Sequence, residues 1–196
     1  DIGTTGVKTC LFGIDKTVEL LADAIEGYEL YVFPDGGAEQ DPDEWWAAMC
    51  KTTKEIFTKT DVTPDDIDGI SFCSQMQGLV LVDKDGLPIR RAMSYMDQRA
   101  RKELKENMAY GPKVAGGNVV KLLKSLSITK AAALSVKDPV YKYLWVKNNE
   151  PDVFKKVYKW LDVKEALIAR MTGKFIMTPD SAFGTLLYDV RPGKQG

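Results

Sequence analysis

Residues 1–24 read DIGTTGVKTCLFGIDKTVELLADA, and this stretch sets the expected architecture. A glycine and threonine turn precedes a strand-forming run from Val7 to Ile14, Asp15-Lys16 interrupts it, and a second extended run covers Val18–Ala24. Strand formers separated by turn residues predict two strands, and their close spacing predicts an antiparallel pair. The first six residues are typical of a strand-to-turn junction, so we expect the chain to begin inside a strand.

The next strong signal is a helix start at residues 39–46, Glu-Gln-Asp-Pro-Asp-Glu-Trp-Trp. Asp41 suits the N-cap, Pro42 suits the first helical position, and Glu44 would complete a capping box. Apolar residues then recur at helical spacing until about Thr58. A strand pair followed by a capped helix predicts a mixed α/β domain.

Farther along the chain, the signals are shorter. Strands are predicted at Ile67–Cys73, Leu79–Val82 and Val157–Leu161, and helices are predicted to follow the N-caps Asp97, Asp138 and Asp162. Only weak helical patterns occupy the region from Tyr110 to Val136, and its structure is left open. Strands and helices are both substantial, which again favours the α/β class.

Composition excludes several classes of function. The 196 residues include 27 Lys+Arg and 28 Asp+Glu, a formal net charge of −1, so no basic field is available to hold nucleic acid or an anionic membrane. With no histidine, Ser-His-Asp and Cys-His nucleophiles and His-ligated zinc are excluded. Three widely spaced cysteines favour a reduced, cytoplasmic setting. The longest apolar stretch, residues 45–50, has only six residues, far below the roughly 20 that span a bilayer.

The sharpest candidate for chemistry is Asp-Ile-Gly-Thr-Thr at residues 1–5. Backbone N–H groups and hydroxyls of Gly3, Thr4 and Thr5 can approach a phosphate, and Asp1 at a strand end can hold Mg²⁺ with its waters. Considered alone, this pentapeptide is equally well explained as an exposed turn.

Two other polar segments follow predicted strands. Gln75-Met76-Gln77-Gly78 comes after the strand predicted at 67–73, and carboxamides suit sugar hydroxyls because they both donate and accept. In the second segment, Tyr95 to Arg99, an aromatic ring beside the Asp97 carboxylate could hold a polyol, although an Asp at this place is more often an N-cap.

Taken together and in this order, these segments resemble the N-terminal lobe of the FGGY carbohydrate kinases, the family that contains xylulokinase, glycerol kinase and gluconate kinase. Residues 1–5 are similar to the family's first phosphate loop, and residues 39–46 to its Glu-Gln-Asp-Pro helix start. Further matching segments extend the resemblance over essentially the whole chain: Gly69–Gly78, Tyr95–Arg99, Lys142–Trp145, Asn149–Pro151 and Lys159–Asp180.

The resemblance implies an α/β fold, the ribonuclease-H-like domain of the actin-like ATPase superfamily, with a mixed sheet and flanking helices. Residues 1–196 would be the sugar-binding and phosphate-loop lobe of the protein. The C-terminal nucleotide-binding lobe, with the adenosine pocket and the general-base aspartate, would follow Gly196. No catalytic residue is therefore assigned within this chain, and the isolated lobe is expected to be inactive.

The implied reaction is ATP-dependent phosphorylation of a sugar or polyol hydroxyl, with ATP and Mg²⁺ as cofactors. By the resemblance, Asp1 would organise Mg²⁺, and Gly3, Thr4 and Thr5 would line the γ-phosphate. The residues expected to face the sugar are Gln75, Met76, Gln77, Gly78, Tyr95 and Asp97, with Asp138 a weaker candidate. The expected partners are the sugar, the chain's own second lobe and, as one option, an identical subunit.

Departures from the family pattern guide the expected sugar. Xylulokinases typically have histidine where this chain has Gln77, glycerol kinases carry Arg-Glu at Met76 and Gln77, and Tyr95 replaces a frequent tryptophan. Glycerol is thus disfavoured, and a ketopentose such as xylulose is favoured. Two alternatives stay open. One is a sugar-sensing module that transfers no phosphate, and the other, ranked last, is a ribonuclease-H-like nuclease, which would need several clustered carboxylates.

Overall fold

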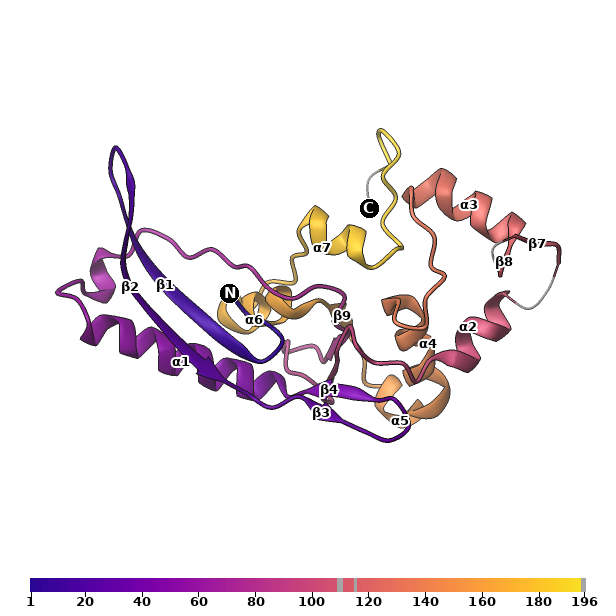
Figure 1. Ribbon diagram of the computed structural model, residues 1–196, viewed down its shortest axis with the longest axis horizontal. Helices are drawn as coiled ribbons and strands as arrows, with labels where there is room; N and C mark the ends of the chain where they lie inside the picture. The colour runs from indigo at the N-terminus through magenta and orange to yellow at the C-terminus, as the bar shows by residue number, and fades with distance from the viewer. Residues whose placement is uncertain (109–110, 115, 195–196) are drawn as a thin grey trace.

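The chain folds into a mixed α/β structure, and the computed structural model describes residues 1–108, 111–114 and 116–194 (Figure 1). The strands are β1 (Gly6–Ile14), β2 (Val18–Gly27), β3 (Tyr31–Val32), β4 (Ala38–Gln40), β5 (Val80–Val82), β6 (Ala92–Met93), β7 (Lys113–Val114), β8 (Gly117–Asn118) and β9 (Lys159–Leu161). The helices are α1 (Pro42–Thr58), α2 (Arg101–Met108), α3 (Val119–Thr129), α4 (Pro139–Asn149), α5 (Pro151–Phe154), α6 (Val163–Thr172) and α7 (Pro179–Gly184), with a 3₁₀ turn at Pro64–Asp66.

The β1–β2 hairpin and α1 form one end of the molecule, as the left side of Figure 1 shows. The two strands pair antiparallel from Gly6 opposite Gly27 to Ile14 opposite Val18, so the predicted strand pair is confirmed. α1 packs along both strands and buries Trp45 completely.

The start of α1 is confirmed in part. Asp41 is the N-cap, because its side chain accepts a hydrogen bond from the Asp43 N–H, and the helix ends at Thr58 as predicted. The expected capping box with Glu44 is wrong. That carboxylate accepts instead from the Glu29 N–H (3.0 Å) and the Tyr31 hydroxyl (2.5 Å), so it fixes the chain that enters β3.

β5 is buried on both faces. Val80 and Val82 pack in the apolar cluster that contains Trp45 and residues of α6. Leu79 and Leu81 pack in a second cluster, with Val146 of α4. Since a strand sends alternate side chains to opposite faces, a continuous apolar run is what a strand between two helical layers requires.

Two predicted elements are corrected. Ile67–Cys73 does not form a strand. In the described part of the chain, the only pairing near this segment is a single parallel bridge between Ile2 and Ser74, just after its end. The helix expected to follow Asp97 begins only at Arg101, because the Asp97 carboxylate bonds to groups outside that helix.

The later elements agree with the sequence. β9 pairs antiparallel with β5, α6 follows its N-cap Asp162, and Gly173 ends α6 in the left-handed conformation. In the region left open, Tyr110 lies outside the described residues, and the β7–β8 pair and α3 occupy much of the remainder. Among the described residues, no helix combines the length and the apolar character that a membrane crossing requires.

Candidate active site

The glycine and threonine turn near the start of the chain is narrow and accessible. Gly3 N–H donates to the Gly6 carbonyl across 2.9 Å, which places Thr4 and Thr5 at the centre of a four-residue turn. Thr4 is half-buried, and Thr5 and Asp1 are exposed. The turn can therefore present the hydroxyls and N–H groups of Thr4 and Thr5 and the Asp1 carboxylate to a ligand, whereas the Gly3 N–H is already bonded within the turn.

This turn lies beside the segment that contains Gln75. Ile2 accepts a backbone hydrogen bond from the Gln75 N–H across 2.8 Å. The Gln40 side chain connects the two segments, because it donates to the Thr4 carbonyl (2.6 Å) and accepts from the Gln75 amide (2.8 Å). Thr4 Oγ1 also lies 3.5 Å from the Tyr95 hydroxyl. Residues predicted from three distant parts of the sequence thus meet at one place.

The end of this segment has an unusual backbone. Gln77 has φ 62°, in the left-handed region that glycine usually occupies. The N–H groups of Gln77 and Gly78 each donate to the Asp162 carboxylate across 2.9 Å. A Cβ on Gly78 would lie 2.8 Å from Val163 Cγ2, so a residue without a side chain is needed there. Met76 next to them is 44% exposed and accessible to a ligand.

A buried lysine lies under the same segment. Lys142 of α4 is fully buried, and its Nζ donates to the carbonyls of Gln77 (2.6 Å) and Ser94 (3.0 Å). Burial lowers the pKa of Lys142 to about 8, and the nearby carboxylates of Asp97, Asp162 and Asp138 oppose that change.

The carboxylates around Lys142 are themselves affected by burial. Burial raises the pKa of Asp162 to about 6, although three backbone N–H groups stabilise its charged form. Burial also raises the pKa of Asp138, whose carboxylate accepts from the Ser135 N–H across 2.7 Å. Asp138 is 9% exposed and interacts electrostatically with Lys142, so the structure gives it little surface for a direct sugar contact.

Asp97 is not placed where a sugar could contact it directly. Its side chain is fully buried, and its oxygens accept from the Ala38 N–H (2.9 Å) and from the backbone and guanidinium of Arg99 (2.7–3.0 Å). The expected sugar contact at Asp97 is replaced by a buried ion pair that orders the chain after Tyr95. Tyr95, in contrast, is 37% exposed.

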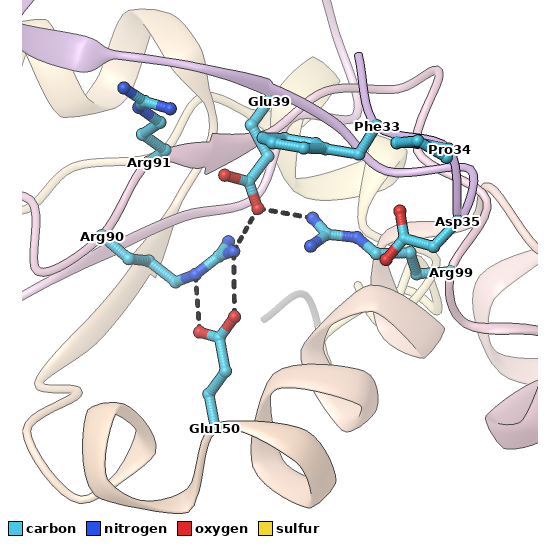
Figure 2. Close-up of a pocket in the computed structure, with 8 residues that line it drawn as sticks. All are labelled: Phe33, Pro34, Asp35, Glu39, Arg90, Arg91, Arg99 and Glu150. Carbon is cyan, nitrogen blue, oxygen red and sulfur yellow. Dashed lines mark hydrogen bonds and ion pairs between the residues drawn. The ribbon is translucent and has the colours of Figure 1, made fainter. Parts of the chain in front are cut away.

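A pocket of about 630 Å³ lies at a different place and contains none of the predicted site residues (Figure 2). In Figure 2 the Glu39 carboxylate lies between the guanidinium groups of Arg90 and Arg99, and Glu150 pairs with Arg90. These arginines are neutralised by carboxylates, so the pocket offers little net attraction for an anion. The ion pairs connect β4 with the chain before β6, the segment that precedes α2 and the start of α5.

Sequence reasoning missed three residues that build this site: Gln40, Lys142 and Asp162. Asp162 was expected only as an N-cap, and it does accept from the Val163 N–H across 2.8 Å. Lys142 stands within the apolar series Val140 to Trp145, which was the available signal that its side chain is buried. Gln40 lies just before the predicted start of α1, and no local sequence pattern indicated that its side chain would bond to Thr4.

Comparisons with known proteins agree with this architecture. The profile of the FGGY family of carbohydrate kinases, N-terminal domain, matches residues 1–194. Xylulose kinase from Staphylococcus xylosus is 30% identical over 191 residues, which cover 97% of this chain and 37% of that protein. Xylulose kinase from Bacillus subtilis (strain 168) is 32% identical over 191 residues, with 97% and 36% covered. The crystal structure of ligand-bound xylulose kinase from Lactobacillus acidophilus superposes with a TM-score of 0.82 at 26% identity, over 100% of this chain and 37% of that one.

The chain belongs to the FGGY family of carbohydrate kinases, and its match is to the N-terminal domain of that family. Its fold is that of the actin-like ATPase superfamily, as the resemblance implied. The chain spans little more than a third of the length of the curated relatives that it matches.

Proposed function

We propose that the protein containing this chain transfers the γ-phosphoryl group of ATP to a hydroxyl of a sugar, and that residues 1–196 are its sugar-binding and phosphate-loop lobe. The observation that carries the proposal is the junction of the turn at Gly3–Thr5 with Gln75 and Tyr95, since Thr4 Oγ1 lies 3.5 Å from the Tyr95 hydroxyl. A phosphoryl donor on the turn and an acceptor hydroxyl beside Tyr95 would be adjacent, which is the main requirement of phosphoryl transfer.

Asp1, Gly3, Thr4 and Thr5 supply the phosphate side of the proposed site. The donor set fits Mg²⁺, which usually binds one or two carboxylates together with waters and substrate phosphates. Asp1 is an exposed carboxylate next to the turn, and within the described ranges no three acidic or cysteine side chains form a ready metal cage. Asp1 would therefore hold the ion through its waters, and the ion would neutralise charge on the phosphates.

The sugar side of the proposed site consists of Gln75, Met76, Gln77, Gly78 and Tyr95. Gln75 Oε1 is buried without a hydrogen-bond partner among the described residues, while its Nε2 is bonded to Gln40, so this amide would bind a sugar hydroxyl only after the side chain turns outward. In this proposal Asp97 and Asp138 do not contact the sugar; they are buried and stabilise the charge of Lys142. The relatives are named as xylulose kinases, and together with the amides at Gln75 and Gln77 this favours a ketopentose such as xylulose.

The rest of the protein would supply the nucleotide-binding lobe and the general-base aspartate. Closure of the two lobes would exclude water from the transferred phosphoryl group. A cytoplasmic location and a homodimer stay predictions, as does the use of Mg²⁺. The relatives' names give no support to a sensing module that lacks phosphoryl transfer.

The test is ADP release by the complete parent protein with ketopentoses, polyols and aldonates, beside its Asp1→Asn variant. We expect turnover with a ketopentose, and a decrease of about 100-fold or more in kcat for Asp1→Asn with unchanged thermal unfolding. Asp15→Asn, in the exposed β1–β2 turn, is the matched control. Sugar binding without turnover by the wild-type protein would refute the kinase proposal, and full activity of Asp1→Asn would refute the metal role.

A further inference from the structure

Gln77 has a backbone conformation that its own side chain disfavours. Its φ of 62° lies in the left-handed region, which costs a residue with a Cβ about 1–2 kcal/mol. Asn and Asp tolerate this region because their short side chains bond locally, but glutamine lacks that advantage. The contacts around Gln77 must therefore stabilise the conformation.

Two oppositely charged side chains bind the peptide groups on either side of Gln77. Asp162 accepts from its N–H across 2.9 Å, and Lys142 donates to its carbonyl across 2.6 Å. Lys142 is fully buried and Asp162 is 3% exposed. Hydrogen bonds that involve a charged group are stronger than neutral ones, and burial reduces competition from water.

The same two side chains extend this arrangement to the neighbouring segments. Lys142 Nζ also donates to the Ser94 carbonyl across 3.0 Å, immediately before Tyr95. Asp162 also accepts from Gly78 N–H, and it caps α6. The charged groups that face Lys142 from the packed elements are Asp97, Asp138 and Asp162, and all three stabilise its ammonium form.

We propose that Lys142 and Asp162 are positioning residues that hold Gln77 in its left-handed conformation and thereby orient the Gln77 carboxamide and Tyr95 toward the sugar. Neither side chain is assigned a contact with the sugar. The inference rests on the proposed function, because sugar binding is the property that the two residues would adjust.

The kinetic test uses the complete parent protein with D-xylulose and ATP. In Lys142→Met the side chain keeps its unbranched shape, is one atom shorter and loses both hydrogen bonds. We expect the KM for the sugar to rise about tenfold or more while the KM for ATP stays within about twofold. Asp162→Asn loses one of the two hydrogen bonds from the backbone N–H groups of Gln77 and Gly78, and we expect the KM for the sugar to rise about threefold to tenfold. Lys147→Met, an exposed lysine of the same helix, should leave both constants unchanged.

A second measurement is independent of turnover. Hydrogen exchange of a peptide covering residues 74–80 should become faster in Lys142→Met and Asp162→Asn, and stay unchanged in Lys147→Met. If the wild-type protein phosphorylates no sugar, the proposed function fails, and exchange alone decides the positioning role. If Lys142→Met does not fold, Asp162→Asn decides it. Unchanged sugar KM and unchanged exchange in folded variants would overturn the inference.

Discussion

The Gln75 side-chain amide donates a hydrogen bond to Gln40 Oε1 across 2.8 Å, and Gln40 donates in turn to the Thr4 carbonyl across 2.6 Å. Gln40 is 1% exposed at the end of β4, so water competes little with these bonds. One buried side chain therefore fixes the distance between the proposed phosphate turn and the proposed sugar segment.

Gln40→Met should disturb both halves of the site. Methionine keeps the length of the side chain but leaves the Thr4 carbonyl and the Gln75 amide without their partner. We expect the free energy of unfolding to fall by about 1–3 kcal/mol, and the KM values for ATP and sugar to rise together. Denaturant unfolding and steady-state kinetics measure these effects. Gln98→Met, which removes only an exposed 3.3 Å contact with Arg101, is the control. Equal behaviour of the two variants would show that Gln40 does not connect the two segments.

Gln77→Gly separates the backbone of this position from its side chain. Glycine adopts φ near +62° without steric cost, which offsets its greater freedom in the unfolded chain. We expect a free energy of unfolding that is unchanged or higher by up to about 1 kcal/mol, with a higher KM for the sugar. Gln77→Val, whose β-branched side chain disfavours positive φ, should instead lose about 1–3 kcal/mol. Greater destabilisation by glycine than by valine would contradict the role assigned to the backbone.

Local chemistry explains which parts of the fold the sequence predicts well. An N-cap such as Asp41 bonds to the N–H of Asp43, two residues away, and a glycine such as Gly173 ends a helix by its own conformation. Such signals depend on neighbours in the chain, so the starts of α1 and α6 are predictable. The turn at residues 3–5 was predictable for the same reason.

Long-range contacts decided the positions where prediction failed. Asp97 has the pattern of an N-cap, but its carboxylate bonds to the Ala38 N–H, 59 positions away in the sequence. Lys142 is bonded to the carbonyls of Gln77 and Ser94, at separations of 65 and 48 positions. No pattern local to either residue contains these partners. The turn at residues 3–5 and the segments with Gln75 and Tyr95 have local sequence patterns, whereas the burial of Asp97 and the bonds of Lys142 depend on contacts that only the three-dimensional structure gives.

The buried Lys142 should make stability depend on pH in the alkaline range. Its pKa is about 8 in the folded protein, against an ordinary value of 10.5. Between these values the unfolded chain keeps a proton that the folded protein has lost, so the free energy of unfolding rises with pH. The stability that the folded protein gains from this lowered pKa is complete above pH 10.5 and is lost as the pH falls through 8.

Denaturant unfolding of the wild-type protein and Lys142→Met at pH 7, 8, 9 and 10 measures this contribution as a difference. We expect the wild-type protein to gain stability relative to the variant from about pH 8 upward. Burial raises the pKa of Tyr28, and this lowers the free energy of unfolding as the pH rises above about 10. The effect is the same in the wild-type protein and in the variant, so it cancels in the difference. A difference that is constant from pH 7 to 10 would contradict the lowered pKa of Lys142.

Gly78→Ala tests how closely α6 must approach the proposed sugar segment. The added Cβ would lie 2.8 Å from Val163 Cγ2 and 3.0 Å from Asp162 Oδ1, both shorter than ordinary contacts. Gly78 is not among the glycines with positive φ, so alanine would not strain the backbone there. The destabilisation would come from steric contact with Val163 and with Asp162, whose carboxylate holds Gln77. We expect a loss of about 1–3 kcal/mol in the free energy of unfolding, and a higher KM for the sugar.

Gly69→Ala is the matched control for Gly78→Ala, since it makes the same chemical change where no atom lies within 4 Å. At this exposed position alanine should leave stability unchanged or raise it by less than about 1 kcal/mol, because it reduces the freedom of the unfolded chain. Denaturant unfolding and sugar kinetics of the two variants in the complete parent protein make the comparison. If both alanines behave alike, α6 can move away from Gly78 at no cost, and the close packing of Asp162 against this segment does not determine sugar binding.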